Sequence, residues 1–152
     1  MSAAEQKEAF QGALAGALED ACSLEVVQAV HGRLLEKIEA NREDKEAEPL
    51  ALSAGEIGGI LRDCGVAEEK AEAFRSRCGE AFGGAALNPE NLIDAKRFDV
   101  KTEHAAISID PAYSYLVETR IIDGRKYLLI PAGEGVEVNG LSVGLEAETP
   151  EA

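Results

Sequence analysis

The stretch Tyr115–Pro131, which reads YLVETRIIDGRKYLLIP, decides the fold that we predict for this chain. Two runs rich in β-branched and aromatic residues flank the dipeptide Asp123-Gly124. This dipeptide is typical of a two-residue type I′ turn, in which both turn positions need a positive φ. In that register Arg120 faces Tyr127 across the strands. The sequence therefore predicts an antiparallel hairpin.

The two faces of this hairpin differ in chemistry, because successive strand side chains point to opposite faces. An isolated hairpin is marginal in water, so we expect the rest of the chain to cover its more aliphatic face. The face predicted to be buried carries Val117, Thr119, Ile121, Leu128 and Ile130. The other face, which we name the outer hairpin face, carries Glu118, Arg120, Ile122, Tyr127 and Leu129.

The chain before residue 85 has the periodicity of helices. Apolar residues recur there three or four positions apart among good helix formers. Ser53 and Glu56 have the spacing of a capping box, and Gly65 suits the left-handed position that follows a helix. A charged stretch without large apolar residues, 41–49, is predicted to be a linker. We expect four helices, over 3–21, from Ser23 to about Ala40, from Ser53 to Cys64, and over 68–82.

Past residue 84 the pattern alternates, as it does in strands. A strand is predicted near 97–102, and a turn or bulge near Glu103-His104 would keep the following isoleucines on the same face. Asp110-Pro111 is typical of the start of a short helical turn. Asn139-Gly140 predicts a second type I′ hairpin.

The helices precede the strands along the chain, which predicts an α+β fold. We expect about four N-terminal helices packed on a small C-terminal antiparallel sheet of hairpins, with about five or six short strands. In this organisation residues 1–84 form the helical part and residues 85–143 form the β part packed on it. The acidic residues 144–152 form a tail that we expect to be disordered.

Composition excludes several classes of function. The 152 residues carry a net charge of −14, which disfavours binding to nucleic acid and to anionic membranes. No apolar run approaches the ~20 residues of a membrane span, and the N-terminus lacks a secretory signal. Only the segment 96–130 lacks a negative net charge, because it has six basic and five acidic side chains. We therefore expect a cytoplasmic protein.

The residues capable of chemistry do not form a known motif. The three cysteines, Cys22, Cys64 and Cys78, are expected to be reduced thiols. A disulfide between Cys64 and Cys78 is geometrically possible, but buried thiols are the preferred interpretation. His31 falls on the apolar stripe of the second helix and is interpreted as a packed side chain. The pattern predicts no metal site, no catalytic residue and no cofactor.

Four segments carry a resemblance to a known family: AEQKEAF at 4–10, RFDVKT at 97–102, LVETRIIDGRKYLLI at 116–130 and VEVNG at 136–140. Together they resemble the C-terminal part of a bacterial family known only as a domain of unknown function, the family numbered 4317. Its members are longer, so the resemblance implies a fragment of a larger protein. It also implies an α+β module in the cytoplasm, and it brings no activity.

Two interpretations of the outer hairpin face stay open. The cross-strand neighbours Arg120 and Tyr127 form an ordinary surface pair, worth about 0.2–1 kcal/mol, or they belong to a docking patch with Glu118 and Leu129, since Arg and Tyr are enriched at interface hot spots. On the second interpretation the chain is a non-enzymatic interaction or scaffold module. Its partner is then the rest of a longer parent protein or another protein.

Two other hypotheses compete with the docking patch. A small-molecule or enzymatic pocket between helices and sheet would be centred on His104 and the Asp110 turn. A homodimer would form through an edge strand, for example in the 136–143 hairpin. The sequence itself does not choose among these functions.

Overall fold

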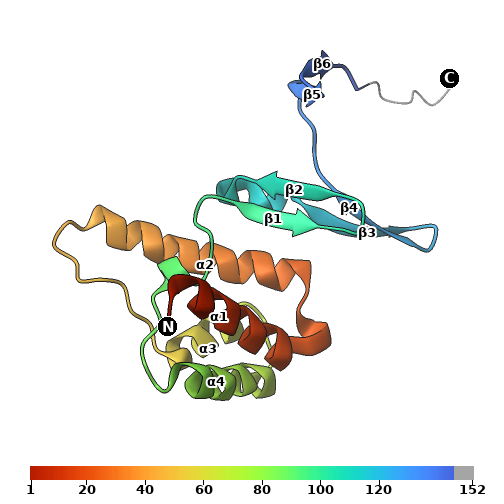
Figure 1. Cartoon of the computed structure of the whole chain (residues 1–152). Coiled ribbons are helices and arrows are strands. Elements are labelled where there is room, and N and C mark those ends of the chain that lie inside the picture. Colours follow the sequence, from red (N-terminus) through yellow and green to blue (C-terminus); the bar gives the residue numbers. More distant parts are fainter. Residues whose placement is uncertain (146–152) are drawn as a thin grey trace. The chain divides into compact units, whose positions relative to one another are not determined.

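The computed structural model describes residues 1–145 and has the predicted order of helices followed by strands (Figure 1). The chain divides into two compact units, which we name the helical unit, Met1–Tyr115, and the hairpin unit, from Leu116 onward. The α+β class is confirmed. The helical unit contains α1 (Ala3–Leu18), α2 (Leu24–Glu43), α3 (Ala54–Asp63) and α4 (Glu68–Phe82).

Local hydrogen bonds explain where the helices begin and end. The Ser53 hydroxyl accepts a hydrogen bond from the Glu56 N–H at 3.0 Å, and the Glu56 carboxylate accepts one from the Ser53 N–H, so the predicted capping box is confirmed. After α3, Gly65 adopts φ 94°, and the Val66 N–H donates to the Leu61 carbonyl at 3.0 Å. This arrangement is a Schellman motif, which satisfies carbonyls at the helix end.

Most buried apolar side chains of the helical unit form one hydrophobic cluster. Helix α4 packs against both α1 and α3, and α2 contributes Val30 and Leu34 to the same cluster. Phe74 of α4 is fully buried and contacts Phe10 of α1 edge to face, with ring centroids 5.8 Å apart. Edge-to-face aromatic pairs stabilise a core beyond the area that they bury.

Two connecting segments close this core. Leu52, before α3, and Leu87, after α4, exchange two backbone hydrogen bonds of 2.7 Å, and both side chains are buried. The short 3₁₀ helix η2 (Pro89–Asn91) follows, with the Asn88 side chain accepting from the Glu90 N–H. The core therefore extends beyond the four helices to the segment that leads into the strands.

The first hairpin belongs to the helical unit. Strands β1 (Phe98–Lys101) and β2 (Ala106–Ile109) pair antiparallel, with Phe98 opposite Ile109 and Val100 opposite Ile107. The Thr102 hydroxyl accepts hydrogen bonds from the N–H groups of His104 and Ala105. The predicted turn at Glu103-His104 is therefore confirmed. After β2, the Asp110 carboxylate accepts from the Ala112 N–H as the 3₁₀ helix η3 (Pro111–Leu116) begins.

The hairpin unit contains two further hairpins, β3 (Glu118–Ile122) with β4 (Arg125–Leu129), and β5 (Val136–Val138) with β6 (Leu141–Val143). Both turns have the predicted type I′ geometry. Asp123 and Gly124 have φ 50° and 80°, and Asn139 and Gly140 have φ 52° and 84°. These left-handed values are ones that glycine and asparagine adopt at little cost.

Two predictions about the strands need correction. The six described strands form three separate two-stranded sheets, not one continuous sheet. The face predicted to be buried is only partly so: Val117 is 3% exposed, whereas Ile121 is 70% and Ile130 48% exposed. An alternating pattern fixes which side chains share a face, but their burial depends on what lies against that face. The predicted tail lies, beyond Leu145, outside the described residues.

Candidate functional site

The outer hairpin face has the register that the sequence predicted. Arg120 pairs with Tyr127, Glu118 with Leu129, and Ile122 with Arg125. Within this face Ile122 is 43% and Tyr127 41% exposed, while Leu129 is half-buried. Each cross-strand pair of this face therefore combines a charged side chain with a large apolar one, on a surface that reaches solvent.

The charged side chains of this face are held only weakly by their neighbours. Arg120 Nη2 lies 3.7 Å from Glu118 Oε2, and both side chains are at least 60% exposed. Exposed ion pairs of this kind contribute about 0–1 kcal/mol. No ion pair of Arg125 is found among residues 1–145. Both guanidinium groups can therefore pair with carboxylates of another molecule at little cost.

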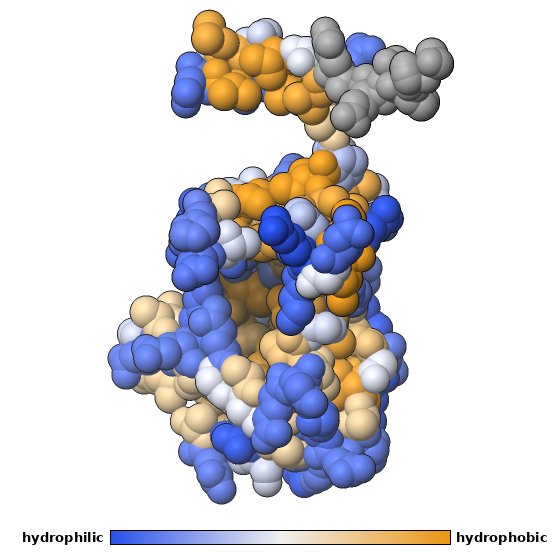
Figure 2. Space-filling view, turned by 90° about the vertical axis from the view of Figure 1, so that its right-hand side faces the viewer, coloured by the Kyte–Doolittle hydropathy of each residue, from blue (hydrophilic) through white to orange (hydrophobic). Residues whose placement is uncertain are grey.

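Exposed apolar residues also occur on the last hairpin. Val138 is 51% and Leu141 70% exposed, at the two positions that flank the Asn139-Gly140 turn. Figure 2 shows hydrophobic side chains gathered over β5 and β6. The hairpin unit thus presents apolar side chains on both of its hairpins.

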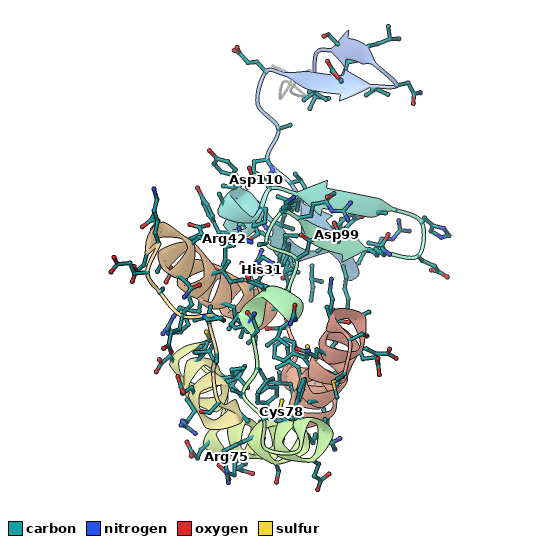
Figure 3. All side chains as sticks on the ribbon, turned by 60° about the vertical axis from the view of Figure 1, so that its left-hand side comes forward. His31, Arg42, Arg75, Cys78, Asp99 and Asp110 are labelled. Carbon is teal, nitrogen blue, oxygen red and sulfur yellow. The ribbon has the colours of Figure 1, made fainter. Side chains whose placement is uncertain are left out.

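His31 is the packed side chain that the sequence predicted. It is 9% exposed, and its ring contacts Phe98 edge to face, with centroids 5.2 Å apart. Figure 3 shows His31 on the side of α2 that faces β1. Its Nε2 lies 3.0 Å from the Asp94 carbonyl oxygen, an acceptor, so Nε2 carries the proton and donates.

The other ring nitrogen of His31 is unusual. Nδ1 is buried and has no hydrogen-bond partner. Burial lowers the pKa of His31, against the opposing effects of the Asp94 carbonyl and carboxylate, and the nearby charge of Lys7 lowers it further. The ring is therefore neutral at neutral pH, and Nδ1 is an unused acceptor.

A cleft adjoins His31, and we name it the His31 cleft. It has a volume of about 250 Å³ and lies among α1, α2, the segment after η2, and β1. It was not predicted from the sequence. The spacing of Lys7, Phe10 and Leu14 was the available signal, because positions i, i+3 and i+7 share one face of a helix.

The other residues considered from the sequence do not form a site. His104 lies at the tip of the β1–β2 hairpin, where its side chain is 90% exposed. The ring is therefore surrounded by solvent and does not line a pocket. Asp110 is exposed and caps η3. Within the part of the chain that the structure describes, no three His, Cys, Asp or Glu side chains are grouped to hold a metal ion.

The three thiols are free and differ in environment. Cys78 of α4 is fully buried (Figure 3), and burial raises its pKa to about 11. Cys64 is half-buried, and desolvation also raises its pKa. Cys22 is exposed. The prediction of buried thiols holds fully for Cys78 and in part for Cys64.

The length and hydropathy of the helices decide whether one of them could cross a membrane. Among the described residues, none of the helices is long and apolar enough to cross one.

Comparison with known proteins identifies a family and nothing closer. The chain matches no curated protein and no solved structure. A family model described as "Domain of unknown function (DUF4317)" matches residues 1–141, which is nearly the whole chain. The chain therefore belongs to the family DUF4317.

Proposed function

We propose that this chain is a protein-interaction module of the cytoplasm, and that the outer hairpin face is its docking surface. The observation that supports this most is the exposure of Ile122 and Tyr127 beside Arg120 and Arg125. Tyr and Arg are among the residues most enriched at interface hot spots, and each cross-strand pair of this face joins a charged side chain to a large apolar one.

The charge of the hairpin indicates the chemistry of the partner. Residues 116–130 carry three basic and two acidic side chains, a net charge of +1 in a chain of net charge −14. The partner is a protein that offers carboxylates around an apolar centre. Complementary charge of this kind steers association and selects the partner.

The size of the hairpin also supports docking. Strands β3 and β4 have five residues each and form a sheet of two strands. An element of this size gains little from its own packing, so covering its apolar side chains would stabilise both the hairpin and the complex. A partner that covers Ile122 and Tyr127 would do this.

Site-specific photo-crosslinking in the cells that produce the protein tests the proposal. A photoreactive phenylalanine replaces Tyr127 in one variant and Tyr113, which is 54% exposed in the helical unit, in the control. We expect a discrete adduct from position 127 and none from position 113. An adduct of twice the mass of the chain would identify a second copy as the partner.

A pair of charge variants makes the test specific. Arg120→Ala removes a cation from the outer hairpin face, whereas Lys126→Ala removes one from the opposite face of β4. We expect Arg120→Ala to lose the adduct and Lys126→Ala to keep it, with similar thermal midpoints in both. Equal crosslinking from positions 127 and 113, or an adduct unaffected by Arg120→Ala, would refute the docking surface.

A further inference from the structure

The His31 cleft has apolar walls and a size suited to a small molecule. Phe10 and Leu14 of α1, Val27 of α2 and Phe98 of β1 supply aliphatic and aromatic surface. A volume of about 250 Å³ is below the range of pockets for drug-sized ligands. The cleft therefore suits a ligand about as large as one substituted aromatic ring.

The charged side chains that line the cleft differ in the number of ion pairs and hydrogen bonds that they make. Asp94 is engaged three times, since its carboxylate pairs with Arg97 Nε at 3.5 Å and accepts from the Lys96 N–H at 2.8 Å, while its carbonyl accepts from His31. Lys7, by contrast, makes no ion pair within residues 1–145. The lining thus has one cation, Lys7, that makes no ion pair within the described residues.

The remaining charged residue of the lining, Asp99, makes no ion pair with Lys7 within residues 1–145. Asp99 is exposed and follows the buried Phe98 in β1 (Figure 3), so water screens its charge. The cleft therefore favours an anion at Lys7 next to an apolar surface.

We propose that the His31 cleft binds a small monocarboxylate with an apolar body. The carboxylate pairs with the Lys7 ammonium, and the apolar body packs between Phe98 and the α1 side chains Phe10 and Leu14. The site lies within the helical unit, and it is independent of the proposed docking surface.

His31 provides an internal reporter of such binding. Desolvation lowers the pKa of this buried ring, Asp94 opposes that effect, and the charge of Lys7 lowers the pKa further. Arg97 and Asp99 are the other charged groups that line the cleft. A carboxylate bound at Lys7 would offset the ammonium charge, and the pKa of His31 would rise. The ring-proton titration of His31, followed by NMR, would therefore move to higher pH.

The test uses benzoate as the probe and the full chain as the protein. Benzyl alcohol, which lacks the carboxylate, and benzylamine, which has the opposite charge, are the controls. We expect benzoate to cause saturable shifts of the backbone amides of His31 and Phe98, and the two controls to bind at least about fivefold more weakly. Absence of saturable shifts with benzoate, or equal affinity for benzylamine, would overturn the proposal.

Three variants assign the binding to the cleft. Lys7→Met should weaken benzoate binding at least fivefold, while Lys45→Met, which removes an exposed lysine from the linker after α2, should leave it unchanged. Leu14→Trp fills the cleft without changing charge, and it should abolish binding while the far-ultraviolet circular dichroism stays the same. Unchanged affinity in Lys7→Met, or equal losses in Lys7→Met and Lys45→Met, would show that the carboxylate does not bind at Lys7.

Discussion

The core of the helical unit and the hairpin β3–β4 were predicted from equally regular patterns, yet they differ in burial. Phe74 in α4 is fully buried, whereas Ile121 in β3 is 70% exposed. A helical stripe of this length meets other helices of the same unit. A two-stranded ribbon has two faces and no interior, so a regular pattern cannot bury both. Apolar periodicity therefore predicts which side chains share a face, whereas their burial requires a second layer of structure packed against that face.

The largest expected effect tests this contrast directly. Phe74→Ala should lower the free energy of unfolding by about 3–5 kcal/mol, because it leaves a cavity beside Phe10. Ile121→Ala, the matched truncation of an exposed apolar side chain, should change it by no more than about 0.5 kcal/mol. Urea denaturation of both variants measures the difference. Comparable losses would mean that Ile121 is buried in solution.

A smaller, local effect is expected at the turn of β3–β4. Gly124 has φ 80°, so Gly124→Val should cost about 1–2 kcal/mol in this hairpin. Hydrogen exchange should quicken at the amides of β3 and β4, while the amides of α4 keep their protection. Equal loss of protection in both elements would show that the hairpin and the helical core unfold as one.

The cap of α3 provides an effect of about 1 kcal/mol. Ser53→Ala removes the hydroxyl that accepts from the Glu56 N–H, and N-cap losses typically cost about this much. Ser142→Ala, at an exposed position in β6, is the control and should be nearly neutral. Chemical denaturation followed by circular dichroism reports both. A neutral Ser53→Ala would indicate that water replaces the cap.

The smallest effect concerns the pH dependence of the helical unit. Burial lowers the pKa of His31 below the usual 6.5, so the unfolded chain binds this proton more readily than the folded one. The contribution of the neutral His31 ring to the free energy of unfolding is complete above pH 6.5. It declines as the pH falls toward the lowered pKa of His31 in the folded chain. Relative to His31→Leu, the wild type should lose stability over that interval. A difference that does not vary with pH would contradict the burial of the ring.

Local features of the fold could be predicted because they depend on few residues. Ser53 with Glu56, Gly65 after α3, and Asp123-Gly124 between β3 and β4 each satisfy a backbone requirement within a short segment. Such rules act regardless of what the rest of the chain does. The predicted boundaries of α3 and the register of β3 with β4 follow from them.

Features that depend on distant segments were harder to predict. The antiparallel pairing of Leu52 with Leu87 and the contact of His31 with Phe98 join residues that no local pattern relates. The pairing of hairpins into one sheet was expected and is absent among the described strands, because each turn fixes only its own two strands. For the candidate sites, the register of the outer hairpin face was predictable, and the His31 cleft was not.

The capping box of α1 was not predicted, although it depends on two residues that are close in the sequence. The Ser2 hydroxyl accepts from the Glu5 N–H at 3.1 Å, and the Glu5 carboxylate accepts from the Ser2 N–H. The serine and glutamate have the same spacing as Ser53 and Glu56. The signal was present in the sequence, and the same rule would have found it.

Residue-resolved hydrogen exchange of the intact chain tests the central contrast most directly. We predict that core amides of α1 and α4 exchange only through global unfolding, whereas amides of β3 and β4 exchange through openings of much lower free energy. Addition of a partner captured at Tyr127 should raise the protection of β3 and β4 selectively. Protection in the free chain that is as high in β3 and β4 as in α4 would contradict the account.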